Sequence, residues 1–413
     1  MTDLDLKERK RILDKVSRLV ETKHFNPSLN GADWNSLVAQ RSDRILSASS
    51  TEQFEKEIQS LVAELRTSHT GFFHKSGRTV PARHAINATF KACQVDGSAR
   101  WVFQDVHEGG TASILGIEPG DVLVKVNGEP ISPPVQPVFK MATQTEFTIR
   151  KRDGKILSAP AMTPKPISGK RPIAEPKALS VSKLHGSTGF IKIRIFPGAV
   201  GIDLAAEIDR AVAGISDCDR LIIDLRGNTG GGIGGMRMMS YLTPEQIPIG
   251  YSLTGQRAKS GFEREKLTRF CRIPRRKIAL AWLILRYASV IVDQSICLVT
   301  EGLPRQKFQD RVVILVNEHS ASAAEMLAAF AQENQLATIV GTKTSGRLLS
   351  GRGFHVGNGY VLGLPVAAYF TWNGALLEGT GLKPDVEIEM TCDALRTGSD
   401  VQLEKAIEVV KRL

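Results

Sequence analysis

Ser322 lies where an apolar, strand-like run gives way to a helix-like one. The run is Val312–Val316, and the residues that follow it read "NEHSASAAEMLAAFAQ". A Ser in this place has its own backbone N–H and that of the next residue directed toward an oxyanion beside it, and the helix dipole has the favourable sign. Ser322 is therefore a candidate nucleophile, with Ser320 as a competitor earlier in the turn. Taken alone, a Ser at a helix start is more often only an N-cap.

A second segment places glycines directly after an apolar strand. In "LIIDLRGNTGGGIGG" the strand leads into Asp224, Arg226 and Asn228, and then into Gly230 and its neighbours. Glycine amides can be approached without a side chain in the way, which is what an oxyanion hole requires. A phosphate cradle requires the same. However, no Lys-Ser/Thr pair follows the glycines and the dinucleotide spacing is absent, so nucleotide binding is disfavoured.

The remaining sequence predicts the elements that position these residues. Residues 1–66 have apolar positions at helical spacing, which predicts a cap of three amphipathic helices. From 95 to 160, short strands and Gly turns predict a small β-rich domain, and the Pro- and Lys-rich residues 163–177 are typical of a linker. Beyond them strands and helices alternate, which predicts an α/β domain. Ser399 with Gln402 predicts the cap of a last helix.

The β-rich stretch has turn signals at defined places. In "GGTASILGIEPGDVLVKVNGEPI" a short helix signal precedes a turn at Pro119 and Gly120, an alternating strand over Val122–Val126, and a turn at Asn127 and Gly128. This passage resembles a PDZ domain, whose groove receives an extended peptide, often a C-terminus, as an additional strand. A small β-barrel that only packs against its neighbours is the alternative.

The order of several motifs carries a more specific resemblance. The PDZ-like stretch is followed by "DLRGNTGG", "SASAAE", "TKTSGR" and "LEGTGLKPDVEI". Together these motifs resemble the family of carboxy-terminal-processing and tricorn-core serine peptidases. The resemblance implies a crotonase-like (ClpP/crotonase) α/β protease domain formed by residues 67–94 and 170–413. It also implies an inserted PDZ-like domain at residues 95–160, with the helical cap of residues 1–66 ahead of both.

The same resemblance implies roles for individual residues. The nucleophile falls on Ser322 and the oxyanion donors on the amides of Gly230 and Ala323. Gly231 and Arg347 are our candidates for substrate binding. The processing proteases have a Lys general base where this sequence has Arg347. An Arg does not release its proton near neutral pH, because its pKa exceeds about 12. A Ser-Lys dyad is therefore excluded, and Arg347 is expected to bind a peptide carboxylate or to brace its loop.

The replacement base is indicated by "LRTSHTGFF". In the tricorn-type branch a Ser-His-Thr motif supplies the base, and it falls on Ser68, His69 and Thr70. That branch also uses a Glu ahead of a "G-x-x-P-D" motif, which falls on Glu378. A neutral imidazole with a pKa near about 6.5 can accept a Ser proton, and a Glu can orient it directly or through Ser68. His319, on the turn before the nucleophile, is the rival base.

Composition limits the class of protein. The 413 residues are 42% hydrophobic and 23% charged, as in soluble globular proteins of two or three domains. The formal charge of +11 comes without a nucleic-acid motif, so a basic solvated surface is favoured over a nucleic-acid partner. The N-terminus is charged where an export signal needs an apolar core, so we expect a cytoplasmic protein. The five scattered cysteines predict reduced thiols, with neither a disulfide framework nor a metal site.

A basic run at residues 264–277 precedes an apolar run at residues 278–285. The apolar run is too short for an integral membrane segment, which needs about 20 residues. A lid or a contact within a homo-oligomer is the favoured interpretation, ahead of attachment to a membrane surface.

Together these features predict a serine endopeptidase that cleaves peptides or unstructured protein C-terminal tails through an acyl-enzyme, with His69 as the base and no metal or cofactor. The PDZ-like domain is expected to capture the tail or to gate access. If Arg347 marks lost chemistry and not an exchanged base, the chain is a catalytically inactive, PDZ-containing scaffold that binds peptides. A crotonase-like enzyme acting on a thioester shares the architecture but leaves the PDZ-like stretch unexplained.

Overall fold

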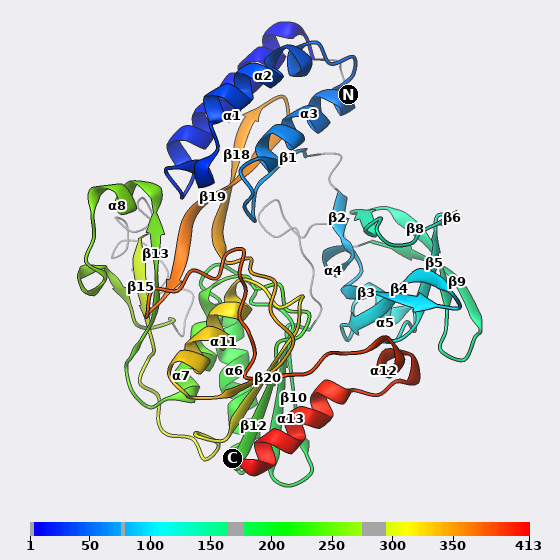
Figure 1. Cartoon of the computed structure of the whole chain (residues 1–413). Coiled ribbons are helices and arrows are strands. Elements are labelled where there is room, and N and C mark those ends of the chain that lie inside the picture. The colour runs from blue at the N-terminus through cyan, green and yellow to red at the C-terminus, as the bar shows by residue number, and fades with distance from the viewer. Residues whose placement is uncertain (1–3, 76–78, 164–176, 275–294) are drawn as a thin grey trace.

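The computed structural model describes residues 4–75, 79–163, 177–274 and 295–413. Figure 1 shows a helical cap at the N-terminus, a small β unit at one side, and a larger α/β part that holds the C-terminus. A sheet containing β18 (Leu349–Gly357) and β19 (Tyr360–Thr371) extends from the α/β part to the cap. The chain therefore has a mixed α/β fold.

The helical cap confirms the three helices predicted at the N-terminus. They are α1 (Leu6–Lys23), α2 (Trp34–Leu46) and α3 (Thr51–Ala63), with a 3-10 turn at Leu29–Gly31. Phe54 of α3 contacts the rings of Phe72 in β1 (Gly71–His74) and Tyr360 in β19. Burying one such side chain stabilises the fold by about 1.5–3 kcal/mol. The cap is thus packed on the sheet, and the chain passes between them through residues 64–70, which include His69.

One sheet connects the cap to the α/β part. Its strands in spatial order are β1, β19, β13 (Pro248–Thr254), β15 (Ile296–Val299) and β14 (Arg269–Phe270), and β18 also pairs with β19. Gly71 of β1 and Gly353 of β18 are both register partners of Gly363 in β19. The start of β1 and the first half of β18 therefore flank the same strand. Between β13 and β14 the chain forms α8 (Gly255–Ser260) and a 3-10 turn at Arg264–Lys266.

The second sheet is the core of the α/β part. Its strands in spatial order are β10 (Leu179–Leu184), β11 (Thr188–Ile193), β12 (Arg220–Asp224), β16 (Val312–Val316), β17 (Thr338–Gly341) and β20 (Val386–Glu387). Apart from the pair β10 and β11, neighbouring strands run parallel. Because they run parallel, the turns after β12 and β16 meet at one edge of the sheet. These two turns carry Gly230 and Ser322.

Helices cover both faces of this sheet. They are α6 (Ile202–Gly214), a 3-10 turn at Ile233–Gly235, α7 (Met236–Leu242), α11 (Ala323–Glu333) and α13 (Val401–Arg412). Ile223 and Ile314 share a core with residues of α6, α7 and α11, whereas Ile222 and Val313 share a core with α13. Strands buried on both faces are apolar without alternation, which explains the runs "LII" and "VVILV".

The small β unit contains a sheet and a short ribbon. Its elements are β2 (Thr79–Pro81), α4 (Ala82–Ala85), β3 (Ala88–Val95), β4 (Ser98–Val106), α5 (Thr111–Ile114), β5 (Val122–Val126), β6 (Glu129–Pro130), β7 (Val138–Lys140), β8 (Gln144–Arg150) and β9 (Ile156–Met162). The turn predicted at Asn127 and Gly128 joins β5 to β6 with φ of 52° and 80°, as a tight hairpin requires. Apolar residues between Val80 and Phe90 belong to the same hydrophobic core as β4, β5 and β8, so this unit begins ahead of residue 95.

Asp400, and not Ser399, caps the last helix. The Asp400 carboxylate accepts a hydrogen bond from the Leu403 amide at 3.0 Å, whereas the Ser399 hydroxyl donates to Glu404. The predicted cap is therefore wrong by one residue, because Asp and Ser are comparable N-caps and both precede the helix.

Cys93 and Cys392 form a disulfide, which contradicts the prediction of reduced thiols. Cys93 lies in β3 and Cys392 begins α12 (Cys392–Thr397), so the bond fastens the small β unit to the segment ahead of α13. The two residues are 299 positions apart in the chain, and no local spacing pattern could reveal the pair. Cys218, Cys271 and Cys297 are free.

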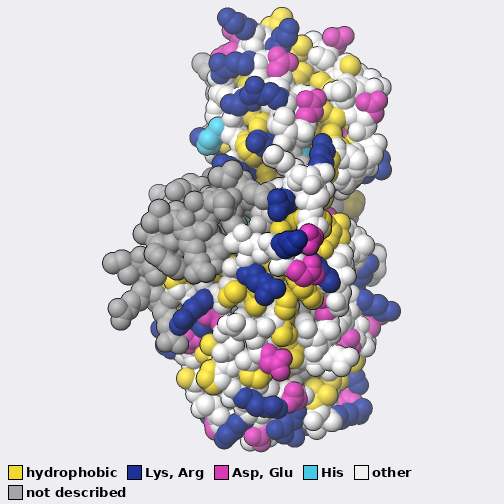
Figure 2. All heavy atoms as spheres, turned by 90° about the vertical axis from the view of Figure 1, so that its left-hand side faces the viewer, with side chains coloured by type: hydrophobic (Ala, Val, Ile, Leu, Met, Phe, Trp, Pro, Cys, Tyr) yellow, Lys and Arg dark blue, Asp and Glu magenta, His cyan; other side chains and the backbone are white. Residues whose placement is uncertain are grey.

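Two predicted segments fall wholly or partly outside the described residues. They are the linker at residues 163–177 and the basic and apolar runs at residues 264–285. Within the part of the chain that the structure describes, no helix is long and apolar enough to cross a membrane. On the face in Figure 2, Lys and Arg side chains are spread over the cap and the α/β part with Asp and Glu among them, as on a solvated surface.

The disulfide predicts a thiol count. Denatured, unreduced protein should give three reactive thiols per chain, and five after reduction. Closing so long a loop stabilises the fold by about 5–6 kcal/mol in the chain-entropy model, so reduction should lower the Tm. Thiol titration with mass spectrometry checks this, with Cys93→Ser/Cys392→Ser as the control, whose Tm should not respond to reductant. Five reactive thiols before reduction would contradict the disulfide.

Candidate active site

Ser322 lies in the sharp turn between β16 and α11. Its backbone has φ 56° and ψ −121°, a conformation that costs a residue with a side chain about 1–3 kcal/mol and persists only where the surroundings enforce it. α11 begins at Ala323, whose amide makes no hydrogen bond to another described residue. Ser320 is fully buried, and its hydroxyl donates to the Leu225 carbonyl at 2.9 Å. Ser320 is thus a structural residue, and Ser322 is the serine open to chemistry.

The Gly-rich turn lies directly against Ser322. A Cβ at Gly230, where φ is +88°, would collide with Ser322 Cβ and lie 2.8 Å from the Ala323 nitrogen. Only glycine fits there. The Gly230 amide donates to Asn228 Oδ1 at 2.8 Å, whereas the Gly231 amide has no hydrogen-bond partner among the described residues. The predicted donor pair is brought together, and the Gly231 and Ala323 amides are the ones left open.

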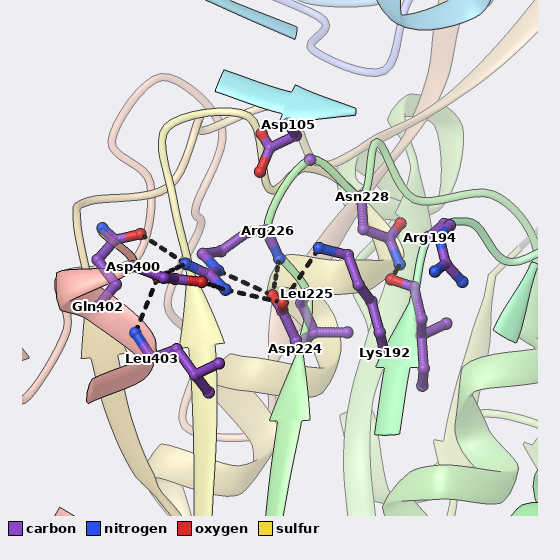
Figure 3. Close-up of polar contacts among 12 residues, drawn as sticks. Asp105, Lys192, Arg194, Asp224, Leu225, Arg226, Asn228, Asp400, Gln402 and Leu403 are labelled. Carbon is purple, nitrogen blue, oxygen red and sulfur yellow. Dashed lines mark hydrogen bonds and ion pairs between the residues drawn. The ribbon is translucent and has the colours of Figure 1, made fainter. Parts of the chain in front are cut away.

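Buried charges anchor the start of this turn (Figure 3). Asp224 accepts from Arg226 Nη2 at 3.0 Å and from Lys192 Nζ at 3.1 Å, and Arg226 also donates to Asp400 at 2.6 Å and to Gln402 at 3.3 Å. Burial acts to raise the pKa of the Asp224 carboxyl, but the charges of Arg226 and Lys192 outweigh it and hold the pKa well below its usual range. Removing one partner from such a buried pair typically costs about 3–5 kcal/mol.

Ser68, His69 and Glu378 form a hydrogen-bonded series. Ser68 Oγ lies 2.8 Å from His69 Nδ1 and donates to Glu378 Oε2 at 2.9 Å, and the Ser68 amide donates to Glu378 Oε1 at 2.7 Å. Because the Ser68 hydroxyl hydrogen goes to the carboxylate, its oxygen accepts from Nδ1–H. That tautomer leaves Nε2 as the unprotonated, proton-accepting nitrogen. The sequence allowed Glu378 to orient His69 either directly or through Ser68, and the structure contains the arrangement through Ser68.

His69 lies against β18, and its side chain is exposed to solvent. A Cβ at Gly351 of β18 would lie 3.0 Å from His69 Cβ. The pKa of the imidazole is lowered from its ordinary value, chiefly by desolvation among the surrounding protein atoms. The charge of Glu378 opposes this shift and that of Arg347 adds to it. His69 is therefore neutral near pH 7, as a general base must be.

Glu325 is a buried carboxylate that the sequence pattern did not single out. It lies in the first turn of α11 and is fully buried. Its Oε2 accepts from the amides of Ser322 at 2.9 Å and Arg347 at 3.0 Å, and its Oε1 accepts from Thr344 Oγ1 at 2.6 Å and the Gly346 amide at 2.8 Å. Burial raises the pKa of this carboxyl against the effect of those hydrogen bonds. The Ser-x-x-Glu spacing from Ser322 is a capping-box signal that could have found it.

The next amide along the chain reaches the other carboxylate. Leu348 N donates to Glu378 Oε2 at 3.0 Å, whereas Arg347 N donates to Glu325. Two successive backbone amides thus connect Glu325, beside Ser322, with Glu378, beside Ser68. Among the described residues no hydrogen bond joins Ser322 to His69, and catalytic hydrogen bonds often close only when substrate is bound.

Within the described structure the other predicted candidates make no hydrogen bond to this series. The rival base His319 has its Nε2 3.2 Å from the Phe90 carbonyl of β3, in the small β unit. The Arg347 side chain is exposed, and so is that of Lys343, four residues earlier in the same segment. Thr70 Oγ1 lies 2.7 Å from Thr67 Oγ1.

Comparison with known proteins gives the site a context. The model of "Peptidase family S41" matches residues 187–388. A "Putative tricorn protease homolog 2" from Streptomyces coelicolor is 25% identical over 95% of this chain and 31% of its own length. A "Carboxy-terminal-processing protease" from Bartonella bacilliformis is 34% identical over 22% of this chain and 21% of its own length. The aligned residues thus span less than a third of either relative.

A solved structure extends the likeness to the fold. The "Photosystem II D1 C-terminal processing protease" has a TM-score of 0.56 and 17% identity, and the match covers 96% of this chain and 98% of that one. At this identity the likeness concerns the fold alone.

Glu325→Gln should impair the nucleophile. Glu325 accepts four hydrogen bonds. A Gln has only one acceptor oxygen, and its NH₂ group would face some of these donors. Each donor left unpaired lowers the free energy of unfolding by about 1–3 kcal/mol. We expect fluorophosphonate labelling to slow by about tenfold or more and the Tm to fall. Glu333→Gln at the end of the same helix is the matched control. Labelling at the wild-type rate would show that Glu325 does not position Ser322.

Arg347→Gln should move the pH dependence of labelling. His69 acts when neutral, so the rate rises with pH through its pKa, which lies below the ordinary value. Removing the Arg347 charge raises that pKa, so the acid limb should shift to higher pH. Rate constants measured between about pH 5 and 9 test this, with Lys343→Gln as the charge-matched control. An acid limb at the wild-type pH would show that the charge of Arg347 does not influence the pKa of His69.

Proposed function

Because this chain belongs to the carboxy-terminal-processing and tricorn-like serine peptidases, we propose that it cleaves peptides or unstructured protein C-terminal tails as an endopeptidase, through an acyl-enzyme. The observation that carries the proposal is the series from Glu378 through Ser68 to His69, which leaves Nε2 of a neutral imidazole free to accept a proton. A site that only bound peptides would not require it.

In the proposed mechanism Ser322 Oγ attacks the scissile carbonyl while His69 Nε2 takes its proton. The carbonyl carbon becomes tetrahedral, and its negative oxygen accepts from the Ala323 amide and from an amide of the Gly230–Gly231 turn. His69 then returns the proton to the leaving amine, and a water repeats the sequence to release the acid. Glu378 acts through the Ser68 hydroxyl and stabilises the imidazolium without taking its proton.

The finer architecture is also part of the proposal. We assign residues 170–413, together with the segment that carries Ser68 and His69, to a crotonase-like protease domain. We assign the small β unit, which begins at β2, to a PDZ-like domain that captures or gates the tail. The parallel sheet with its oxyanion turns supports the first assignment, and the Asn127 and Gly128 hairpin supports the second. A homo-oligomer and a cytoplasmic location stay predictions of the sequence. Disulfides are more typical of oxidising compartments, so the Cys93–Cys392 bond favours a different location.

Two observations favour the alternative, a catalytically inactive peptide-binding scaffold. Arg347 occupies the position of the family's Lys base, and within the described structure no hydrogen bond joins Ser322 to His69. The scaffold requires neither an open Nε2 nor open glycine amides.

The two functions separate in a labelling experiment with a fluorophosphonate probe. We expect the wild type to be labelled, Ser322→Ala to show no labelling, and His69→Ala to react about 10²–10⁴-fold more slowly, as expected on loss of a general base. Arg347→Ala should keep its labelling. Cleavage of an unstructured protein, followed by mass spectrometry of the products, should have the same dependence on Ser322 and His69.

Folded wild type that is not labelled between about pH 6 and 9, yet binds C-terminal peptides, would support the scaffold instead. Labelling that survives His69→Ala unchanged would remove the His base from the mechanism.

A further inference from the structure

A buried carboxylate of the small β unit reaches the turns that hold the proposed oxyanion donors. Asp105 lies near the end of β4 and is 7% exposed. Its Oδ2 accepts from Thr89 Oγ1 at 2.6 Å, within the unit, and from Asn317 Nδ2 at 3.0 Å, across the boundary to the α/β part. Asn317 directly follows β16 and is 1% exposed.

The other end of the Asn317 amide holds two backbone segments at once. Its Oδ1 accepts from the Gly227 amide at 3.0 Å and from the His319 amide at 3.1 Å. Gly227 lies three residues before Gly230, and His319 lies three residues before Ser322. One side chain therefore ties together the two turns that meet at the proposed oxyanion site.

Asp105 and the two backbone amides favour the same orientation of that side-chain amide. An ionised carboxylate only accepts hydrogen bonds, so Asn317 must turn its NH₂ group toward Asp105 and its oxygen toward the two amides. In the flipped orientation the NH₂ group would face two N–H donors. Burial acts to raise the pKa of Asp105, but Lys192, His319, Thr89 and His107 outweigh it and hold the pKa below its usual range, which keeps the group an acceptor.

The surrounding contacts show that the boundary is closely packed here. A Cβ at Gly227 would lie 3.1 Å from Asp105 Cβ, and Figure 3 places Asp105 beside the turn that follows Asp224. Gln104 Nε2 donates to Glu318 Oε1 at 3.0 Å, and His319 Nε2 lies 3.2 Å from the Phe90 carbonyl. Residues 317–319, ahead of the nucleophile, thus each contact β3 or β4.

We infer that Asp105 is a positioning residue: from the small β unit it sets the orientation of Asn317 and thereby the geometry of both oxyanion turns. The inference rests on the proposed function. The acylation rate then depends on how the small β unit packs against the α/β part, although the small β unit contributes no atom to the reaction.

The test compares Asp105→Asn, Asn317→Asp and the double exchange. Asp105→Asn replaces a group that can only accept with an amide that can present either its oxygen or its NH₂ group, so one orientation of Asn317 is no longer imposed. Asn317→Asp places two carboxylates face to face. Each variant should lower kcat and the labelling rate by about 10–100-fold with KM changed less than about threefold, as expected when acylation and not substrate binding is impaired. The double exchange restores an N–H donor facing a carboxylate and keeps acceptors for Gly227 and His319. It should recover the rate to within about threefold of wild type, as for a coupled pair.

Asp121→Asn is the matched control. Asp121 is also fully buried in the small β unit, and its described partners Glu118, Lys151 and Arg152 all belong to that unit. It should lower the Tm while leaving the labelling rate at 25 °C near that of wild type. Wild-type kinetics in both single variants, or no recovery in the double exchange, would overturn the inference.

Hydrogen exchange separates this inference from the proposed function. Exchange at residues 227–231 and 319–323, followed by mass spectrometry, should be faster in Asp105→Asn by about tenfold and unchanged in Asp121→Asn, because the tie between the turns is loosened. If wild-type protein proves unreactive, the proposed function fails while this measurement still decides the positioning role. Unchanged exchange at both turns would contradict that role.

Discussion

The backbone of Arg347 and Leu348 holds the two halves of the site together. The two successive amides of this segment donate to different carboxylates, Arg347 N to Glu325 and Leu348 N to Glu378. Hydrogen bonds from amides to ionised carboxylates are roughly twice as strong as neutral ones, so this segment fixes both acids at once. The backbone at residue 347 does this whatever its side chain. These backbone hydrogen bonds therefore tolerate an Arg at residue 347, where the resemblance to the carboxy-terminal-processing proteases implies a Lys base.

Strain at the reacting groups is offset by buried polar networks elsewhere. Ser322 and His69 both have positive φ, which is unfavourable for residues with side chains. The turn carrying Ser322 is held by Glu325 and Asn317, and the Gly-rich turn by Asn317 and by the ion pairs of Arg226. Both turns lie at the carboxyl edge of a parallel sheet, where the turns that follow neighbouring strands converge. The fold thus supplies proximity, and the buried acids and amides supply orientation.

Sequence patterns predicted the features that local chemistry determines. The cap helices, the hairpin at Asn127 and the turn at Gly230 follow from short motifs, whereas Ser68, His69 and Glu378 were indicated by the resemblance to the tricorn-type peptidases. Contacts between distant segments could not be predicted. The disulfide of Cys93 joins residues 299 apart, Asn317 has no motif around it, and Glu325 looks like an ordinary N-terminal helix residue until the Thr344–Arg347 loop closes over it. The sequence could not distinguish Asp400 from Ser399 as the cap of the last helix, because both are good N-cap residues and both precede the helix.

The most direct test of this account is a crystal structure of the protein after reaction with a peptidyl boronic acid. We predict a covalent bond from Ser322 Oγ to boron, with one boron-bound oxygen within about 3.2 Å of the Ala323 amide and of a Gly230 or Gly231 amide. His69 Nε2 should lie within about 3.2 Å of the adduct while Nδ1 keeps its bond to Ser68. An adduct on another residue, or His69 remote from the adduct with a different group in its place, would contradict the account.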